Sequence, residues 1–132
     1  MIKYLETKEY CSWKLCEDLY AITVVDGSII KDGKILIPSE MRKFFNVNED
    51  TTYYERRITI SYLDGEYTFW LSTDINSGDN TLAINGDFYN TLVGIWNSVV
   101  NDETAGEIYI AFFKLGYDCY EARVGMENKN KK

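Results

Sequence analysis

The fold of this chain is decided by residues 34–45, which read Lys34-Ile35-Leu36-Ile37-Pro38-Ser39-Glu40-Met41-Arg42-Lys43-Phe44-Phe45. The apolar run before Pro38 predicts a buried strand, and pairing should end at the proline because it has no N–H for a sheet ladder. Pro38 or Ser39 can begin a helix, which we expect over residues 39–46. One face of that helix carries the apolar side chains of Met41, Phe44 and Phe45. The stretch therefore predicts a strand that turns at once into a helix.

Length and composition indicate a single globular domain. The chain has 132 residues, of which 45% are hydrophobic and 15% aromatic, enough for a core without covalent staples. No apolar run approaches the roughly 18 residues that span a bilayer, and no signal peptide is visible. Three cysteines, an odd number, predict reduced thiols and a cytoplasmic location. The absence of histidine excludes zinc-finger, His-based triad and facial-triad chemistry.

The net charge of −7 argues against a strongly electrostatic nucleic-acid binder. The charges are unevenly distributed, however. Residues 26–57 carry six basic and six acidic side chains, whereas residues 58–128 carry two basic and eleven acidic ones. Any basic face must therefore come largely from the first half of the chain.

Periodic patterns and turn signals predict a mainly β fold of the α+β class, an open or closed barrel of about seven strands with two short helices. The expected strands are 20–25, 35–37, 58–63, 67–71, 82–84, 108–112 and 120–124, and the expected helices are 39–46 and 88–99. Asp64-Gly65 predicts a hairpin turn. We expect residues 1–19 to form an N-terminal capping segment, 20–125 the barrel domain, and 126–132 a polar tail or the start of a linker.

This order resembles the B-three DNA-binding pseudobarrel, found in plant transcription factors and in the effector domains of some bacterial restriction endonucleases. Three pieces carry the likeness. The Ile35–Pro38 strand with its helix is the first, and the hairpin around Asp64-Gly65 is the second. The third is the helix from Phe88 to Val99 followed by Gly106-Glu107-Ile108-Tyr109-Ile110, where Glu107 replaces the usual Asp. The resemblance covers roughly residues 20–125.

The resemblance implies that two loops grip a DNA duplex and read its major groove. The N-arm would be Asp26 to Lys34 and the C-arm Ser72 to Thr81. Candidates for reading base edges are Ser28, Lys31, Lys34, Asp74, Asn76, Ser77, Asp79 and Asn80. Candidates for phosphate contacts are Arg42, Lys43, Arg56 and Arg57.

A role follows from the same resemblance. The chain would be the recognition domain of a bacterial restriction-type protein, with double-stranded DNA as partner and a nuclease or motor domain C-terminal to it. No cofactor and no metal are expected. Acidic pairs such as Glu103 with Glu107, or Asp74 with Asp79, lie in no catalytic or calcium-loop motif. We therefore expect the chain itself not to be an enzyme.

Ordinary structural interpretations compete with each site candidate. Residues 72–81 have the composition of a solvated hairpin loop, and Arg42 and Lys43 suit the wet face of an amphipathic helix. Arg56-Arg57 can pair with nearby acidic side chains in a surface cluster. The tryptophans Trp70 and Trp96 lie in periodic segments and are expected in the core, and Cys11 and Cys16 are expected to be small buried or half-buried apolar residues.

Two other functions stay open. The first is an acidic protein-interaction module of phage or immunity type on the same barrel, motivated by the net charge of −9 over residues 58–128 (two basic against eleven acidic). The second is a dimeric swapped-hairpin regulator, which Gly33 to Val47 also resembles. Such regulators are about half this length or less, which counts against the second.

Overall fold

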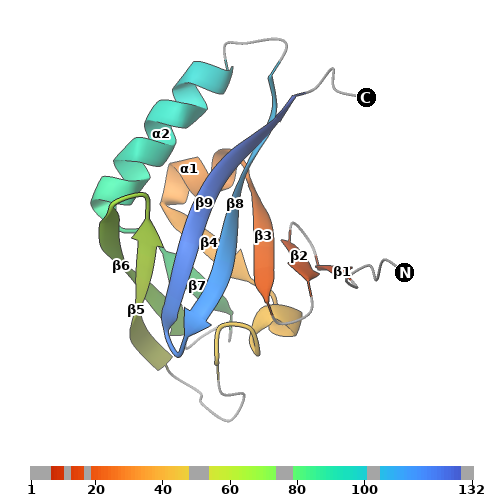
Figure 1. The fold of residues 1–132 in the computed structure, drawn as a ribbon, viewed down its shortest axis with the longest axis vertical. Coiled ribbons are helices and arrows are strands. Elements are labelled where there is room, and N and C mark those ends of the chain that lie inside the picture. Colours follow the sequence, from red (N-terminus) through yellow and green to blue (C-terminus); the bar gives the residue numbers. More distant parts are fainter. Residues whose placement is uncertain are drawn as a thin grey trace.

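The computed structural model describes residues 7–10, 13–16, 19–47, 54–73, 79–100 and 105–128. These residues form one sheet of nine strands with the order β1-β2-β3-β8-β9-β5-β6-β7-β4 (Figure 1). The strands are β1 Thr7–Tyr10, β2 Trp13–Cys16, β3 Tyr20–Val25, β4 Lys34–Ile37, β5 Tyr54–Tyr62, β6 Gly65–Thr73, β7 Asn80–Ala83, β8 Ala105–Gly116 and β9 Cys119–Asn128. The helices are α1 Gly27–Asp32 and α2 Gly86–Val100, and a short 3₁₀ helix, η1, spans Ser39–Met41. The mainly β class is confirmed, but the expected seven strands are too few.

The sheet curls into an open, barrel-like shape. All neighbouring strands are antiparallel except β5 and β9, which run parallel. The two outermost strands of the order, β1 and β4, do not pair with each other. A side chain brings the two margins together, since the indole Nε1 of Trp13 on β2 donates to the carbonyl of Leu36 on β4 at 2.9 Å. A side-chain hydrogen bond thus spans the open side of the barrel.

The segment before residue 20 belongs to the sheet. Its described parts form β1 and β2, and β2 pairs with β3 in the register Cys16 opposite Tyr20. Trp13 is buried and its ring lies 5.6 Å from that of Phe45. The segment therefore contributes two strands and a core residue, which its irregular pattern of apolar and charged residues did not predict.

The strand–proline corner is confirmed, but the helix after it is shorter than expected. The 3₁₀ helix η1 ends at Met41, and hydrogen-bonded turns then continue to Val47. Met41, Phe44 and Phe45 are at most 1% exposed, so the predicted apolar face is buried in full. Phe44 and Phe45 contact each other edge to face at 5.1 Å.

Helix α1 lies between β3 and β4, within the segment Asp26 to Lys34 that the resemblance assigns to the N-arm. The side chain of Asp26 caps the helix by accepting from the backbone N–H of Ile29 at 3.0 Å. Gly33 ends it with φ of 68°, and its N–H donates to the Ile29 carbonyl at 2.8 Å. Asp26-Gly27 and Asp32-Gly33 are therefore the start and stop signals of a helix.

Helix α2 is confirmed nearly at its predicted bounds. Asn85 caps it, with Oδ1 accepting from the backbone N–H of Asp87 at 2.8 Å and of Phe88 at 3.2 Å. Phe88 and Leu92 are buried, and the Phe88 ring lies 5.2 Å from that of Phe69 on β6. The Tyr89 hydroxyl donates to the Ile30 carbonyl, which joins α2 to α1. Neither described helix is long and apolar enough to cross a membrane.

Candidate nucleic-acid interface

The N-arm candidates lie on α1 and at the start of β4. Lys31 and Lys34 are exposed, and the exposed Ser28 hydroxyl donates to Asp26 Oδ1 at 2.9 Å. Because the Ser28 hydroxyl is held at the helix cap, it has an intramolecular partner to give up before it can reach a base. The two lysine ammonium groups are the cations that this arm offers to a polyanion.

The C-arm candidates fall partly outside the described residues, namely Asp74, Asn76 and Ser77. Asp79 is exposed directly before β7.

Asn80, the remaining C-arm candidate, is 1% exposed. Its amide Nδ2 donates to Thr73 Oγ1 at 2.6 Å, and its Oδ1 accepts from Arg42 Nε at 2.7 Å. The structure therefore places Asn80 inside the joint between β6 and β7, not on a surface that could read DNA. Arg42 is half-buried and helps to hold this joint.

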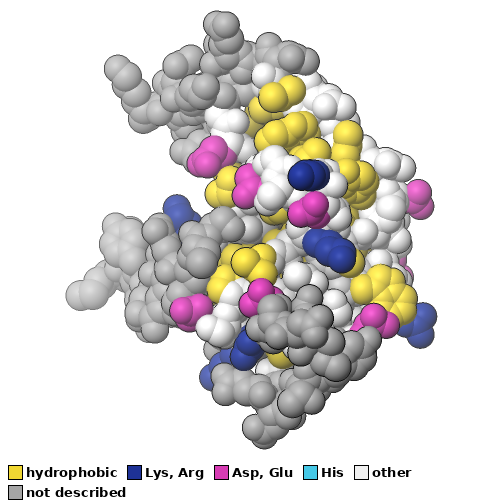
Figure 2. All heavy atoms as spheres, turned by 180° about the vertical axis from the view of Figure 1, so that it is seen from behind, with side chains coloured by type: hydrophobic (Ala, Val, Ile, Leu, Met, Phe, Trp, Pro, Cys, Tyr) yellow, Lys and Arg dark blue, Asp and Glu magenta, His cyan; other side chains and the backbone are white. Residues whose placement is uncertain are grey.

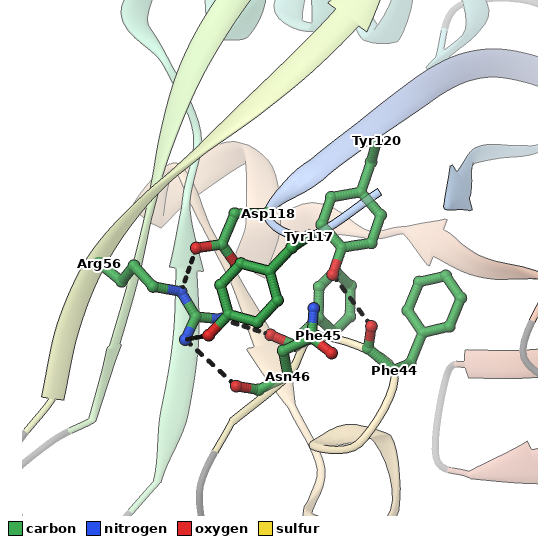
Figure 3. A network of polar contacts seen from close by, with 7 residues as sticks. All are labelled: Phe44, Phe45, Asn46, Arg56, Tyr117, Asp118 and Tyr120. Atoms are coloured by element: carbon green, nitrogen blue, oxygen red, sulfur yellow. Dashed lines mark hydrogen bonds and ion pairs between the residues drawn. The ribbon is translucent and has the colours of Figure 1, made fainter. Parts of the chain in front are cut away.

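Arg56 lies at the centre of a polar network rather than at the surface (Figure 3). Its Nε forms an ion pair with Asp118 Oδ2 at 2.7 Å. Its two terminal nitrogens donate to the carbonyls of Phe45 at 2.6 Å and Asn46 at 3.1 Å. The Tyr117 ring lies over the same guanidinium, 5.3 Å from its carbon. One side chain of β5 thus ties the turn after η1 to the β8–β9 hairpin.

Burial dominates the electrostatics of this network. Burial raises the pKa of the Asp118 carboxyl above its ordinary value, and the Arg56 guanidinium offsets part of that rise. Burial also raises the pKa of Tyr120, whose hydroxyl donates to the Phe44 carbonyl at 2.9 Å. Asn46 and Asp118 both have positive φ, 59° and 56°, so two strained residues meet at Arg56. This arrangement holds the turn after η1 against the β8–β9 hairpin. The same contacts occupy the Arg56 guanidinium, which was a candidate for a phosphate contact.

Arg57 has the opposite environment to Arg56. Along β5 the side chains alternate, with Ile58 and Ile60 buried on the Arg56 side and Arg57 exposed on the other. The guanidinium carbon of Arg57 lies 5.7 Å from the centroid of the Trp70 ring, opposite it on β6. Lys43 is also exposed, after η1. Lys31, Lys34, Lys43 and Arg57 are therefore the candidate residues whose basic groups reach solvent.

Trp70 was expected in the core, but it is 43% exposed. Phe69 and Leu71 on either side of it are fully buried, so the strand pattern itself puts Trp70 on the outer face. Trp96 is half-buried against the core, and Cys16 is buried as expected, while Cys11 lies outside the described residues. An exposed tryptophan beside an exposed arginine is the feature of this face that the sequence pattern could have revealed.

The surface is mixed in charge. On the face seen from behind, Lys and Arg side chains are scattered among Asp and Glu side chains, and no continuous basic field forms (Figure 2). Among the described residues, no group of three or more His, Cys, Asp or Glu side chains could hold a metal ion. This face offers a few separate cations. A nucleic-acid partner would therefore need phosphates at positions that match these cations.

Comparisons with known proteins support the fold. No family model matches the sequence, and no curated protein matches it. The structure is similar to the N-terminal domain of Helicobacter pylori LlaJI.R1, with a TM-score of 0.54 over 80% of this chain and 79% of that chain. The two sequences are 15% identical, so the likeness concerns the fold. The B-three resemblance stays a prediction.

Proposed function

We propose that this chain is a sequence-specific DNA-binding module that reads the major groove of a duplex as the recognition domain of a restriction-type protein. Two lines of support agree. The element order resembles a DNA-binding pseudobarrel, and the fold is similar to a domain of a restriction-type protein. The surface offers exposed cations on and next to α1, where the N-arm of that pseudobarrel would lie.

The observation that carries the proposal is the spacing of the strand ends next to the two arms. Strand β4 pairs with β7 from Lys34 opposite Ala83 to Ile37 opposite Asn80. Helix α1 joins β4 at the Ala83 end, whereas β6 ends and β7 begins at the Ile37 end. Three residue steps at about 3.4 Å separate these ends by roughly 10 Å. With the groove running along the strands, this corresponds to about three base-pair steps of ~3.4 Å, so the two arms can contact base edges in the same stretch of the groove.

In this mechanism the cations position the duplex and the arm side chains read it. Lys31 and the polar side chains of residues 74–79 are the base-reading candidates, and Lys43 contributes a phosphate contact. The acidic remainder of the chain lowers affinity for DNA in general. The affinity for a specific site should therefore exceed the affinity for random DNA by a wide margin, since the electrostatic attraction that drives non-specific binding is weak. A nuclease or motor domain joined to this one would carry out any cleavage.

Selection of binding sites from a random duplex pool tests the proposal. We expect one short motif to be enriched at both ~50 mM and ~200 mM salt. In the selected motif, Lys31→Ala should relax the base choice at one position. Arg123→Ala is the matched control, because Arg123 is exposed on β9 beside Glu121 and should leave the motif unchanged. If no motif is enriched at either salt concentration, the proposal is wrong.

A further inference from the structure

One transverse row of side chains on the outer sheet face has a charge at each end. The strand registers place Arg57 opposite Trp70, Trp70 opposite Ala83, and Ala83 opposite Lys34. The row therefore crosses β5, β6, β7 and β4. Its two ends are exposed cations, and its interior is a half-exposed tryptophan and a small alanine.

The orientation of this row follows from the buried residues beside it. Ile58, Leu71, Leu82 and Ile35 are each the next residue along one of the four strands, and all are at most 1% exposed. Since side chains alternate across a sheet, all four members of the row point away from the core. The row is thus a property of the whole four-stranded segment, not of one flexible side chain.

We propose that Lys34 and Arg57 hold backbone phosphates on opposite strands of the same DNA duplex, one on each side of the groove that the arms enter. This rests on the proposed function. Three inter-strand steps of about 4.8 Å separate the two Cα positions by roughly 14 Å. That distance is of the order of the ~12 Å major groove, which carries one phosphate backbone along each edge. Two long cationic side chains can adjust to the remaining difference.

The row of residues next to the two cations has small side chains at its centre. The adjacent row contains Leu36, Thr81, Ser72 and Glu55, in that strand order. Thr81 and Ser72 are small and are hydrogen-bonded to each other at 3.3 Å between hydroxyl oxygens. Small side chains at the centre let the DNA backbone approach the strands closely. Glu55 lies two residues from Arg57 on the same face, so its carboxylate would repel a DNA phosphate bound there.

Trp70 acts as a positioning residue for Arg57. The ring lies next to the guanidinium and restricts the orientations that the long side chain can take. A pre-oriented cation loses less conformational freedom when it contacts a phosphate. An acidic protein surface is the alternative partner, and it would also be attracted by two cations. Binding to such a surface would not require the two cations to be separated by about the width of a DNA groove.

The experiment combines salt dependence with phosphate ethylation interference, using the duplex enriched by selection. Lys34→Ala and Arg57→Ala should each lower the magnitude of the slope of log K against log salt by about one, and the double variant by about two. Ethylation interference should disappear at phosphates of one strand for Lys34→Ala and of the opposite strand for Arg57→Ala. Arg57→Lys should keep the slope, while Trp70→Ala should weaken interference on the Arg57 strand. Glu55→Gln should tighten binding several-fold.

The outcomes separate this inference from the proposed function. If the unsubstituted chain selects a motif and both single variants bind it with unchanged affinity and slope, the phosphate contacts are wrong and the DNA function stands. Loss of interference on the same strand for both variants overturns the arrangement across the groove. If the unsubstituted chain selects no motif, the proposed function itself fails. Arg123→Ala is again the control and should leave slope and interference pattern unchanged, because it removes a cation from another part of the outer sheet face.

Discussion

Substitution of the adjacent arginines on β5 should cause very different losses of stability. Arg56→Ala removes an ion pair at 2.7 Å and two charge-assisted hydrogen bonds to backbone carbonyls, at a side chain 18% exposed. Breaking a buried pair costs about 3–5 kcal/mol, and residual solvent access lowers this to about 3 kcal/mol here. For a chain of this size, that loss should lower the melting temperature by about 10 °C. Arg57→Ala should cost less than about 0.5 kcal/mol, because its head group is exposed.

Urea unfolding followed by circular dichroism measures both losses, and DNA binding is measured on the same samples at a temperature where both variants are folded. We expect the stability change to follow Arg56 and the change in salt dependence to follow Arg57. The reasoning is refuted if Arg56→Ala loses less than about 1 kcal/mol, or if both variants lose similar stability. If the slope of log K against log salt changes for Arg56→Ala and not for Arg57→Ala, then Arg56 and not Arg57 contacts a phosphate.

The cost of Arg56→Ala should also depend on pH. Burial raises the pKa of Asp118 in the folded protein, and Arg56 limits the rise. Without the arginine, that pKa rises further, so the unfolding free energy of the variant falls as pH increases through it. Below the ordinary carboxyl pKa of about 4, Asp118 is protonated and needs no cation. The stability difference between the two proteins should therefore be smaller near pH 4 than at neutral pH, and an equal difference at both would contradict this account.

Three further substitutions test the fold. Asn80→Ala should cost about 2 kcal/mol, because Arg42 and Thr73 each lose a buried partner; unfolding in urea measures this, and an unchanged DNA motif would confirm that Asn80 does not read bases. Gly33→Ala should cost about 1 kcal/mol in thermal unfolding, since φ of 68° is unfavourable for a residue with a Cβ. Trp13→Phe keeps most of the buried ring but removes the donor to the Leu36 carbonyl. It should lower the unfolding free energy by about 1–3 kcal/mol, and no loss would show that this bond is dispensable.

The sequence predicted the strand–proline corner and helix α2 because their signals are local. Pro38 ends β4 by its missing N–H, and Asn85 caps α2 with its own side chain. The β5–β6 hairpin was also predictable, although its two-residue turn is Leu63-Asp64, one position earlier than expected. Leu63 takes φ of 54° there, a conformation that favours glycine or asparagine and that its residue type does not suggest.

The site was less predictable, because its roles depend on which face a residue occupies. The inward series of Ile58 and Ile60, continued back by two positions, puts Arg56 inside and Arg57 outside. The same argument applied to Phe69 and Leu71 puts Trp70 outside. These assignments could have been made from the sequence. The partner of Arg56 could not, since Asp118 reaches it only through the parallel pairing of β5 and β9, a contact between distant segments.

The β1–β2 hairpin has a consequence for the solution behaviour of shortened chains. A chain that began at residue 20 would keep the whole region that resembles the pseudobarrel, yet it would lose the strand that pairs with the six-residue β3. It would also lose the indole that covers the backbone of β4. The edge of β3 would then be open to pairing with other molecules. We therefore expect the hairpin to limit self-association, and a shortened chain that aggregates would say nothing about its ability to bind DNA.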